Sequence, residues 1–411
     1  MQDPLALSDQ LWRGEVAPEE VNPFAYWGDL IEITSSIAFV PSFANVTACK
    51  TNEGLVLVDT GSPMFANAIH EQVRRWSDDA LNTAVYTHGH IDHVFGVAPF
   101  EAEDGPTPRV VAHALVPGRF QRYEQTAGYN ALINRRQFRL PDLQWPTEYR
   151  YPDETYDHSL DLEVGGRAFA LTHGKGETDD ATWVWIEDEK VLCCGDFFIW
   201  ASPNAGNPQK AQRYPAEWAR ALRAMTELGA ETLLPGHGVP IVGAERVRTA
   251  LEDSAELLES LVAQTLDMIN AGARLDAIVH TVRAPEHLLE KPYLRPTYDE
   301  PEFIVRNIWR LYAGWYDGDP ATLKPAGEAA VAEEVCGLAG GAPALAKRAT
   351  ELADSGDLRL ASRLAEWALI AAPKDEDVKS AHSQIFSARA QSEASTMAKG
   401  IFSWAADERH R

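Results

Sequence analysis

Three histidines and one aspartate stand together in the segment 88–93, and they are the residue types that hold a divalent metal. His88, His90, Asp92 and His93 follow the apolar residues 84–86, which are typical of a strand. A tight loop after a strand can aim alternate side chains at one point, and imidazole with carboxylate suits zinc or a similar ion. A chance cluster of surface histidines is the plainer interpretation. With only 12 histidines in 411 residues, that coincidence is unusual, so the segment predicts a metal site.

Similar residues recur at the ends of four other apolar runs. Asp59 follows 55–58, His173 and Glu177 follow 168–171, Asp196 follows 191–194, and His237 follows 232–234. In layered α/β folds the loops beyond the strand ends converge, and functional sites lie there. A solvated face does not explain acids and imidazoles at successive strand ends. We therefore expect one site with enough ligands for two metals.

This ordered set resembles the metallo-β-lactamase superfamily, whose motifs run Asp, His-x-His-x-Asp-His, His or Glu, Asp, His. The resemblance implies that a first metal binds His88, His90 and Glu177, that a second binds Asp92, His93 and His237, and that Asp196 bridges them. Asp59 matches a residue that supports the ligands from behind, and Asp59 and Asp92 are the expected catalytic carboxylates. A capping carboxylate at a strand-to-helix turn is the plainer role for Asp59.

The third motif leaves two candidates, His173 and Glu177. The superfamily frame there is Gly, the ligand, then Thr or Ser, and the residues 176–178 keep it with Glu177 in the ligand place. His173 stands four residues earlier and would then lie outside the ligand set. With Glu177, three carboxylates and a bridging hydroxide balance the charge of two divalent ions. An anionic substrate would then need cations from elsewhere in the pocket.

Glu at this position is a feature of the zinc-dependent alkyl sulfatases, a branch of the superfamily that the chain also resembles elsewhere. Residues 128–138 are similar to the branch's Asn-Ala-Met insertion with paired arginines, and residues 307–320 to its helical dimerisation domain. The resemblance implies two Zn²⁺ (or other divalent ions) per chain, a homodimer and a small anionic or ester substrate. We expect no counterpart within residues 1–411 of the sterol-carrier-like domain that the long members carry.

Five residues could hold the sulfate of such a substrate, namely Arg135, Arg136, Asn204, Lys210 and Arg213. Arginine, lysine and amide groups supply the charged hydrogen bonds that an anionic ester requires. The branch's sulfate-binding residues after the fourth motif are not reproduced clearly in this stretch. For each arginine, a surface ion pair with one of the many acids is an equally good interpretation.

Composition restricts the partners. The formal net charge of −24 and a pI near 4.9 argue against nucleic acid or an anionic membrane as a partner. No apolar run approaches the roughly 18 residues of a membrane span, and the N-terminus lacks the basic and apolar parts of a signal peptide. The four cysteines show neither a disulfide nor a zinc spacing. We expect a cytoplasmic enzyme without nucleic-acid or membrane partners.

The expected strands and helices, with the resemblance, predict an α/β fold. Residues 1–245 should form an αββα sandwich, and residues 246–411 an all-α dimerisation-like domain. Signals include a hairpin at Gly165-Gly166, helices at 64–76 and 215–229, a long helix from 244, and a helix pair at 343–357 and 358–373. The four aromatic residues at 309, 312, 315 and 316 suit a core or an interface.

The resemblance to the alkyl sulfatases implies a dinuclear hydrolase that cleaves alkyl sulfate esters with a hydroxide held by the metals. A lactone, β-lactam or thioester hydrolase with the same metals is the alternative within enzymes. A non-catalytic, metal-binding interaction protein is the alternative of another class.

Overall fold

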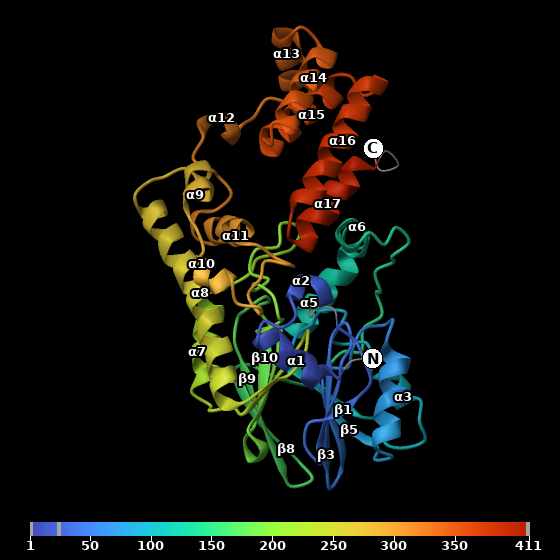
Figure 1. Ribbon diagram of the computed structural model, residues 1–411. Coiled ribbons are helices and arrows are strands. Elements are labelled where there is room, and N and C mark those ends of the chain that lie inside the picture. Colours follow the sequence, from blue (N-terminus) through green and yellow to red (C-terminus); the bar gives the residue numbers. More distant parts are fainter. Residues whose placement is uncertain (1–2, 23–25, 408–411) are drawn as a thin grey trace. The chain divides into compact units, whose positions relative to one another are not determined.

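The computed structural model describes residues 3–22 and 26–407. Residues 1–2 and 23–25 of the first expected domain and residues 408–411 of the second lie outside these ranges. Contacts divide the chain into two compact units. One contains Met1–Ala127 with Pro146–Trp315, and the other contains Gly128–Trp145 with Tyr316–Arg411. The expected sandwich and the helical region that follows it are confirmed (Figure 1). The domain boundary at 245/246 stays a prediction.

The first unit contains two β-sheets. One has the order β1 (Ile31–Glu32), β2 (Ile37–Val40), β3 (Val46–Thr51), β4 (Gly54–Val58), β5 (Leu81–Val85), β6 (Arg109–His113), β7 (Glu154–Tyr156). The other has the order β13 (Ile241–Val242), β12 (Thr232–Pro235), β11 (Val191–Gly195), β10 (Thr182–Ile186), β9 (Arg167–His173), β8 (Ser159–Val164). β4 to β7 are parallel neighbours, as are β11 and β12, so their carboxyl ends share an edge.

The strands read as continuous apolar runs because both faces of each sheet are covered. In β11, Val191 and Cys193 belong to the core that residues of both sheets share, while Leu192 and Cys194 pack with helices. β4 divides in the same way, with Val56 and Val58 in the shared core. The paired cysteines are therefore buried apolar residues, one on each face of the strand.

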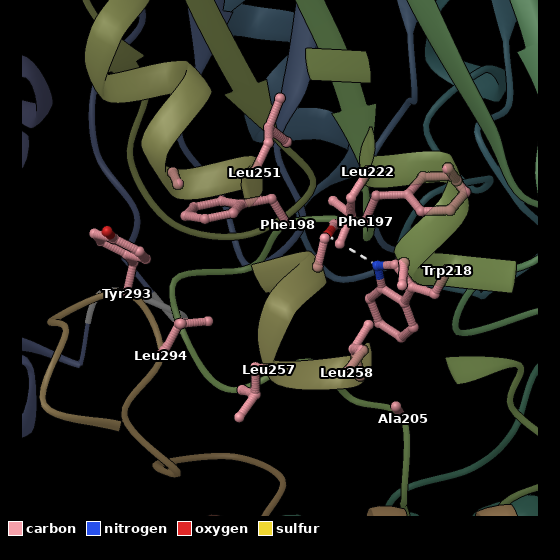
Figure 2. Close-up of a cluster of buried hydrophobic side chains, with 14 of the residues drawn as sticks. Phe197, Phe198, Ala205, Trp218, Leu222, Leu251, Leu257, Leu258, Tyr293 and Leu294 are labelled. Carbon is pink, nitrogen blue, oxygen red and sulfur yellow. Dashed lines mark hydrogen bonds between the residues drawn. The ribbon is translucent and has the colours of Figure 1, made fainter. Parts of the chain in front are cut away.

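Helices cover the outer faces. α3 (Ala66–Trp76), α4 (Ala98–Glu101) and α5 (Val116–Gln125) pack on the first sheet, and α7 (Pro215–Thr226) and α8 (Ala244–Asn270) on the second. Figure 2 shows this second layer, where Trp218 and Leu222 of α7 face Phe197 and the indole N–H of Trp218 donates to the Phe197 carbonyl at 3.1 Å. The expected helix at 64–76 begins two residues late. The helix expected to reach Gly229 ends earlier, at Thr226, and Gly229 turns the chain beyond it with φ +67°.

Within the described ranges, five further helices belong to the first unit. α1 (Pro4–Trp12) and α2 (Pro18–Val21) precede the sheets, and α9 (Leu275–Thr281), α10 (Glu286–Leu289) and α11 (Pro301–Ala313) follow α8. Ile278 of α9 and Ile304 and Ile308 of α11 are buried in the same core cluster as α8. The first part of the region expected to be a separate helical domain therefore packs with the sheets' own helices.

In the part of the second unit that the structure describes, every regular element is a helix. The unit contains α6 (Ala127–Phe138), α12 (Pro320–Leu323), α13 (Glu328–Ala339), α14 (Ala342–Asp354), α15 (Leu358–Ala371), α16 (Glu376–Ser392) and α17 (Thr396–Ala406). The expected helix pair corresponds to α14 and α15. A Cβ on Gly400 would lie 2.3 Å from the carbonyl oxygen of Gln137, so α17 approaches α6 closely because residue 400 is glycine. Within the described ranges, no helix has the length and apolarity that a bilayer crossing demands.

Candidate metal centre

Two sets of metal-type side chains converge beyond the carboxyl ends of the strands. His88, His90, Glu177 and Asp196 form one set, and Asp92, His93 and His237 form the other, each with ligand atoms within 4.8 Å of one another. These are the seven residues expected as ligands. Their assignment to particular ions stays a prediction.

In the first set, His88 Nε2 lies 2.8 Å from His90 Nδ1, and His90 Nδ1 lies 3.9 Å from Glu177 Oε1. The second set joins it through Asp196. Asp196 Oδ1 lies 3.4 Å from His93 Nε2, and Asp196 Oδ2 lies 3.4 Å from His237 Nε2 and 3.7 Å from His88 Nε2. This position between the sets is the one that a bridging carboxylate requires.

The backbone around Asp196 is compact because glycines flank it. Gly195, the last residue of β11, has φ +51°. A Cβ on Gly236, just after β12, would lie 2.1 Å from Asp196 Oδ1. The parallel ends of β11 and β12 can therefore bring Asp196 and His237 together only if residue 236 has no side chain.

Asp59 supports the site without belonging to either set. It is buried with φ +58°, and its carboxylate accepts hydrogen bonds from Thr87 N (2.7 Å), Thr87 Oγ1 (2.8 Å) and His93 Nδ1 (2.7 Å). Because a carboxylate only accepts, His93 must carry a proton on Nδ1, which leaves Nε2 for an ion. His237 is held in the same way, since its Nδ1–H donates to the Phe43 carbonyl.

The charges of the cluster favour a cation. Burial and the neighbouring His93 lower the pKa of His88 to about 4, so its imidazole is neutral at pH 7, as a ligand must be. Burial would also lower the pKa of His93, but Asp196, Asp59 and Asp92 raise it to about 10. Burial, with Asp196 beside it, raises the pKa of Glu177 well above its usual value. Several buried carboxylates here thus compete for positive charge.

Two buried atoms test whether the residues fit a metal. Among the described residues, neither His93 Nε2 nor Asp196 Oδ1 has a hydrogen-bond partner, although both are buried and 3.4 Å apart. Buried polar atoms are nearly always satisfied, and an ion held by His93 and Asp196 together would satisfy both. Nitrogen and carboxylate donors suit zinc and similar divalent ions. The residues therefore fit a divalent metal.

His173 has another environment. Its Nδ1–H donates to the Ala181 carbonyl at 2.9 Å, and its ring stacks on His113 with centroids 3.7 Å apart. Of the two candidates for the third motif, the described ligand sets include Glu177 and not His173.

The expected substrate contacts divide between the two units. Asn204 Nδ2 donates to Glu177 Oε1, and a guanidinium N–H of Arg213 donates to the same oxygen at 3.1 Å. Lys210 belongs to the same segment, where burial and the neighbouring Arg213 lower its pKa to about 8. By contrast, Arg135 and Arg136 lie on α6 in the second unit, where Arg135 Nε donates to the Leu143 carbonyl at 2.7 Å. Whether any of them binds substrate stays a prediction.

The sequence interpretation missed a buried ion pair behind the first set. Asp180 accepts hydrogen bonds from Arg119 Nε (2.6 Å) and from the backbone N–H of Gly89 (3.2 Å), which lies between His88 and His90. A Cβ on Gly89 would lie 2.8 Å from Arg119 Cδ. The glycine between two ligands was the available signal, since it marks a close approach to the backbone.

Comparison with known proteins agrees with this geometry. Residues 40–237 match the family model of the metallo-beta-lactamase superfamily, and residues 274–411 match the model called alkyl sulfatase dimerisation. The chain therefore contains a region of the metallo-beta-lactamase superfamily, residues 40–237. The alkyl sulfatase resemblance is likewise confirmed at the level of sequence relatives.

Among these relatives is a linear primary-alkylsulfatase of Pseudomonas sp., 26% identical over 352 residues, which span 77% of this chain and 65% of the relative. An (R)-specific secondary-alkylsulfatase of Pseudomonas sp. is 27% identical over 82% of this chain and 55% of its own length. The chain thus spans between about half and two thirds of these relatives. The solved sec-alkylsulfatase Pisa1 of Pseudomonas sp. shares the fold, with a TM-score of 0.85, 22% identity, and coverage of 100% of this chain and 68% of that one.

Proposed function

We propose that this protein is a dinuclear metal-dependent hydrolase that cleaves alkyl sulfate esters. The observation that carries the proposal is the pair of ligand sets joined by Asp196, with Asn204 and Arg213 buried against Glu177 beside them. The two joined ligand sets suit activation of water, and Arg213 adds positive charge where an anionic ester would enter. The names of the alkylsulfatase relatives support the sulfate ester as substrate.

Two divalent ions, most simply Zn²⁺, would be held by the seven residues named above, where they would supply a hydroxide at neutral pH and polarise the ester. Asp59 would keep His93 in the tautomer that binds, through the 2.7 Å hydrogen bond to Nδ1. The Asp92 side chain is 20% exposed, against 9% for Asp196 and 6% for Glu177. Asp92 is thus the ligand carboxylate most open to solvent, and it would orient the attacking water.

Lys210 would be the main cation for the sulfate group. Arg213 already donates to Glu177, so its charge is shared with a ligand, whereas Lys210 has a pKa lowered to about 8 by burial and by Arg213. An anion placed near these two cations would relieve their mutual repulsion. Asn204 would add an amide donor.

The test is a substrate panel. Purified protein with zinc should release inorganic sulfate from medium-chain alkyl sulfates faster than it hydrolyses lactones, β-lactams or thioesters. Lactone cleavage without sulfate release would favour the alternative enzyme. Metal binding without hydrolysis of any ester in the panel would favour an interaction protein.

We also propose that the protein is a homodimer. The match of residues 274–411 to the dimerisation family supports it, as does the exposure of Tyr312 (46%) and Trp315 (74%), while Trp309 is buried. Exposed aromatic side chains are enriched in interfaces. Light scattering should give about twice the 45.4 kDa of one chain, and a mass near 45.4 kDa that does not rise on concentration would contradict the dimer. The expected cytoplasmic location stays a prediction.

A further inference from the structure

The segment 202–213, which carries Asn204, Lys210 and Arg213, is irregular along its whole described length. It connects β11 to α7, and none of its residues belongs to a helix or strand. Most of it is nevertheless buried, so its backbone groups need partners other than water. Some of these partners lie within the segment, and others come from residues 295–310, about 90 positions later in the chain.

The first half of the segment is tied at two points. The backbone N–H of Ser202 donates to the Arg295 carbonyl at 2.9 Å. The buried carboxylate of Asp299 accepts from the N–H groups of Gly206 and Asn207, the latter at 3.2 Å. A Cβ on Gly206 would lie 2.4 Å from the backbone of Phe303, so the segment runs directly against α11.

The second half is held by one buried side chain, Asn307 of α11. Its Nδ2 donates to the Arg213 carbonyl at 3.0 Å, and its Oδ1 accepts from the Arg213 N–H at 3.4 Å and from Gln212 Nε2 at 2.9 Å. Arg310 also donates to Oδ1 at 3.1 Å. Because three N–H groups point at one amide atom, that atom must be the oxygen, which fixes the orientation of the Asn307 amide.

Arg213 connects this contact to the metal centre. Its side chain is 3% exposed and its guanidinium lies 3.1 Å from Glu177 Oε1. An arginine side chain is flexible, so the point at which its backbone is fixed helps to decide where the guanidinium can reach. Asn307 binds both backbone polar groups of Arg213 and therefore fixes that point.

We propose that Asn307 is a positioning residue of the metal centre: by holding the backbone of Arg213, it keeps the guanidinium on Glu177 and so raises the affinity of the first ligand set for its ion. The proposal rests on the proposed function, in which Glu177 is a ligand. Hydrogen-bond partners of ligating carboxylates typically change metal affinity by about 10- to 100-fold. Asn307 does not contact Glu177 itself and acts through Arg213, so we expect an effect on metal affinity at the lower end of this range, about tenfold.

The test measures zinc affinity of the full chain by competition with a chromophoric chelator. Asn307→Ala should weaken the binding of one of the two ions about tenfold and leave the other unchanged. Asn307→Asp keeps the acceptor for Arg213 N–H but lacks the donor for its carbonyl, so a smaller loss is expected. Ser254→Ala is the matched control, since it removes one buried hydrogen bond that stays within α8, from Oγ to the Ala250 carbonyl, and should leave both affinities unchanged.

A double-mutant cycle separates positioning from general stability. If Asn307 acts through Arg213, then Arg213→Ala and the double variant with Asn307→Ala should bind zinc equally. Additive losses would overturn the proposal, as would an unchanged affinity in Asn307→Ala. Should Asn307→Ala not fold, Asn307→Asp carries the same comparison. A wild-type chain that binds no divalent metal would instead contradict the proposed function together with this proposal.

Discussion

Replacing Asp59 by asparagine should weaken metal binding, because it should move the ring proton of His93 from Nδ1 to Nε2. The Asp59 carboxylate accepts from Thr87 N on one oxygen and from His93 Nδ1 on the other. An asparagine has one oxygen, and the Thr87 N–H, which can only donate, requires it. The amide NH₂ would then face His93 Nδ1, which must become the acceptor, so the ring proton moves to Nε2 and blocks the atom that faces the other ligands.

The magnitude follows from the two ways in which the asparagine can sit. With the oxygen on Thr87, the wrong tautomer of His93 should reduce zinc affinity about 10- to 100-fold, or about 1.4 to 2.7 kcal/mol. With the amide reversed, His93 keeps its tautomer but the buried Thr87 N–H loses its acceptor, which costs about 1 to 3 kcal/mol of folding stability. Either orientation therefore weakens the holoprotein.

The assay combines zinc affinity from chelator competition with urea unfolding of the metal-free protein. Excess zinc should restore most of the occupancy of Asp59→Asn, because the ligands themselves remain. Asp78→Asn removes the same charge at an exposed position and should behave as wild type. If Asp59→Asn keeps both zinc affinity and stability, then Asp59 does not set the tautomer of His93 and the argument is refuted.

Three further changes test other parts of the site. Glu177→Ala should lower zinc content and turnover sharply, whereas His173→Ala should lower them only mildly. Elemental analysis measures the zinc content, and loss of metal in the His173 variant alone would make His173 the ligand in place of Glu177. Lys210→Ala should raise KM roughly 10- to 100-fold for an alkyl sulfate but not for a neutral ester, as expected for a lost charged hydrogen bond. An equal effect on both esters would show that Lys210 does not bind the sulfate group. The Asp180–Arg119 pair should make stability depend on pH: burial alone would raise the pKa of Asp180, but Arg119 lowers it to about 2, so its contribution is complete above the unfolded value near 4 and is lost as pH falls through 2. Asp180→Asn should accordingly cost about 2 kcal/mol at pH 6 and progressively less toward pH 2 in urea unfolding, and a cost independent of pH would contradict the ion pair.

The clustering of the seven metal-type residues could be predicted because each follows an apolar run as a local pattern. His88 to His93 fall in one loop, and the runs before Asp59, Asp196 and His237 are strands that the structure confirms. Turn signals were also local: Gly165-Gly166 joins β8 and β9 as expected, with φ +56° and +79°.

The supporting contacts could not be predicted, because tertiary packing alone brings their partners together. Arg119 and Asp180 are 61 positions apart, and Asn307 and Arg213 are 94 apart, with no periodicity that relates them. Asn307 was interpreted only as part of a dimerisation motif, whereas its side chain binds the segment beside the metal centre. Likewise, the grouping of α6 with the C-terminal helices depends on Gly400, which by itself is only a glycine within a helical pattern.

The most direct test of the central claim measures metal content and sulfate release on the same protein. Wild type should contain close to two divalent ions per chain, most simply zinc, and should release sulfate from a medium-chain alkyl sulfate. Removing the metal with a chelator should abolish the release, and adding zinc back should restore it. Asp196→Ala, which removes the carboxylate shared by both ligand sets, should bind fewer ions and release no sulfate. A metal-free wild-type chain that still releases sulfate at the full rate would contradict the account.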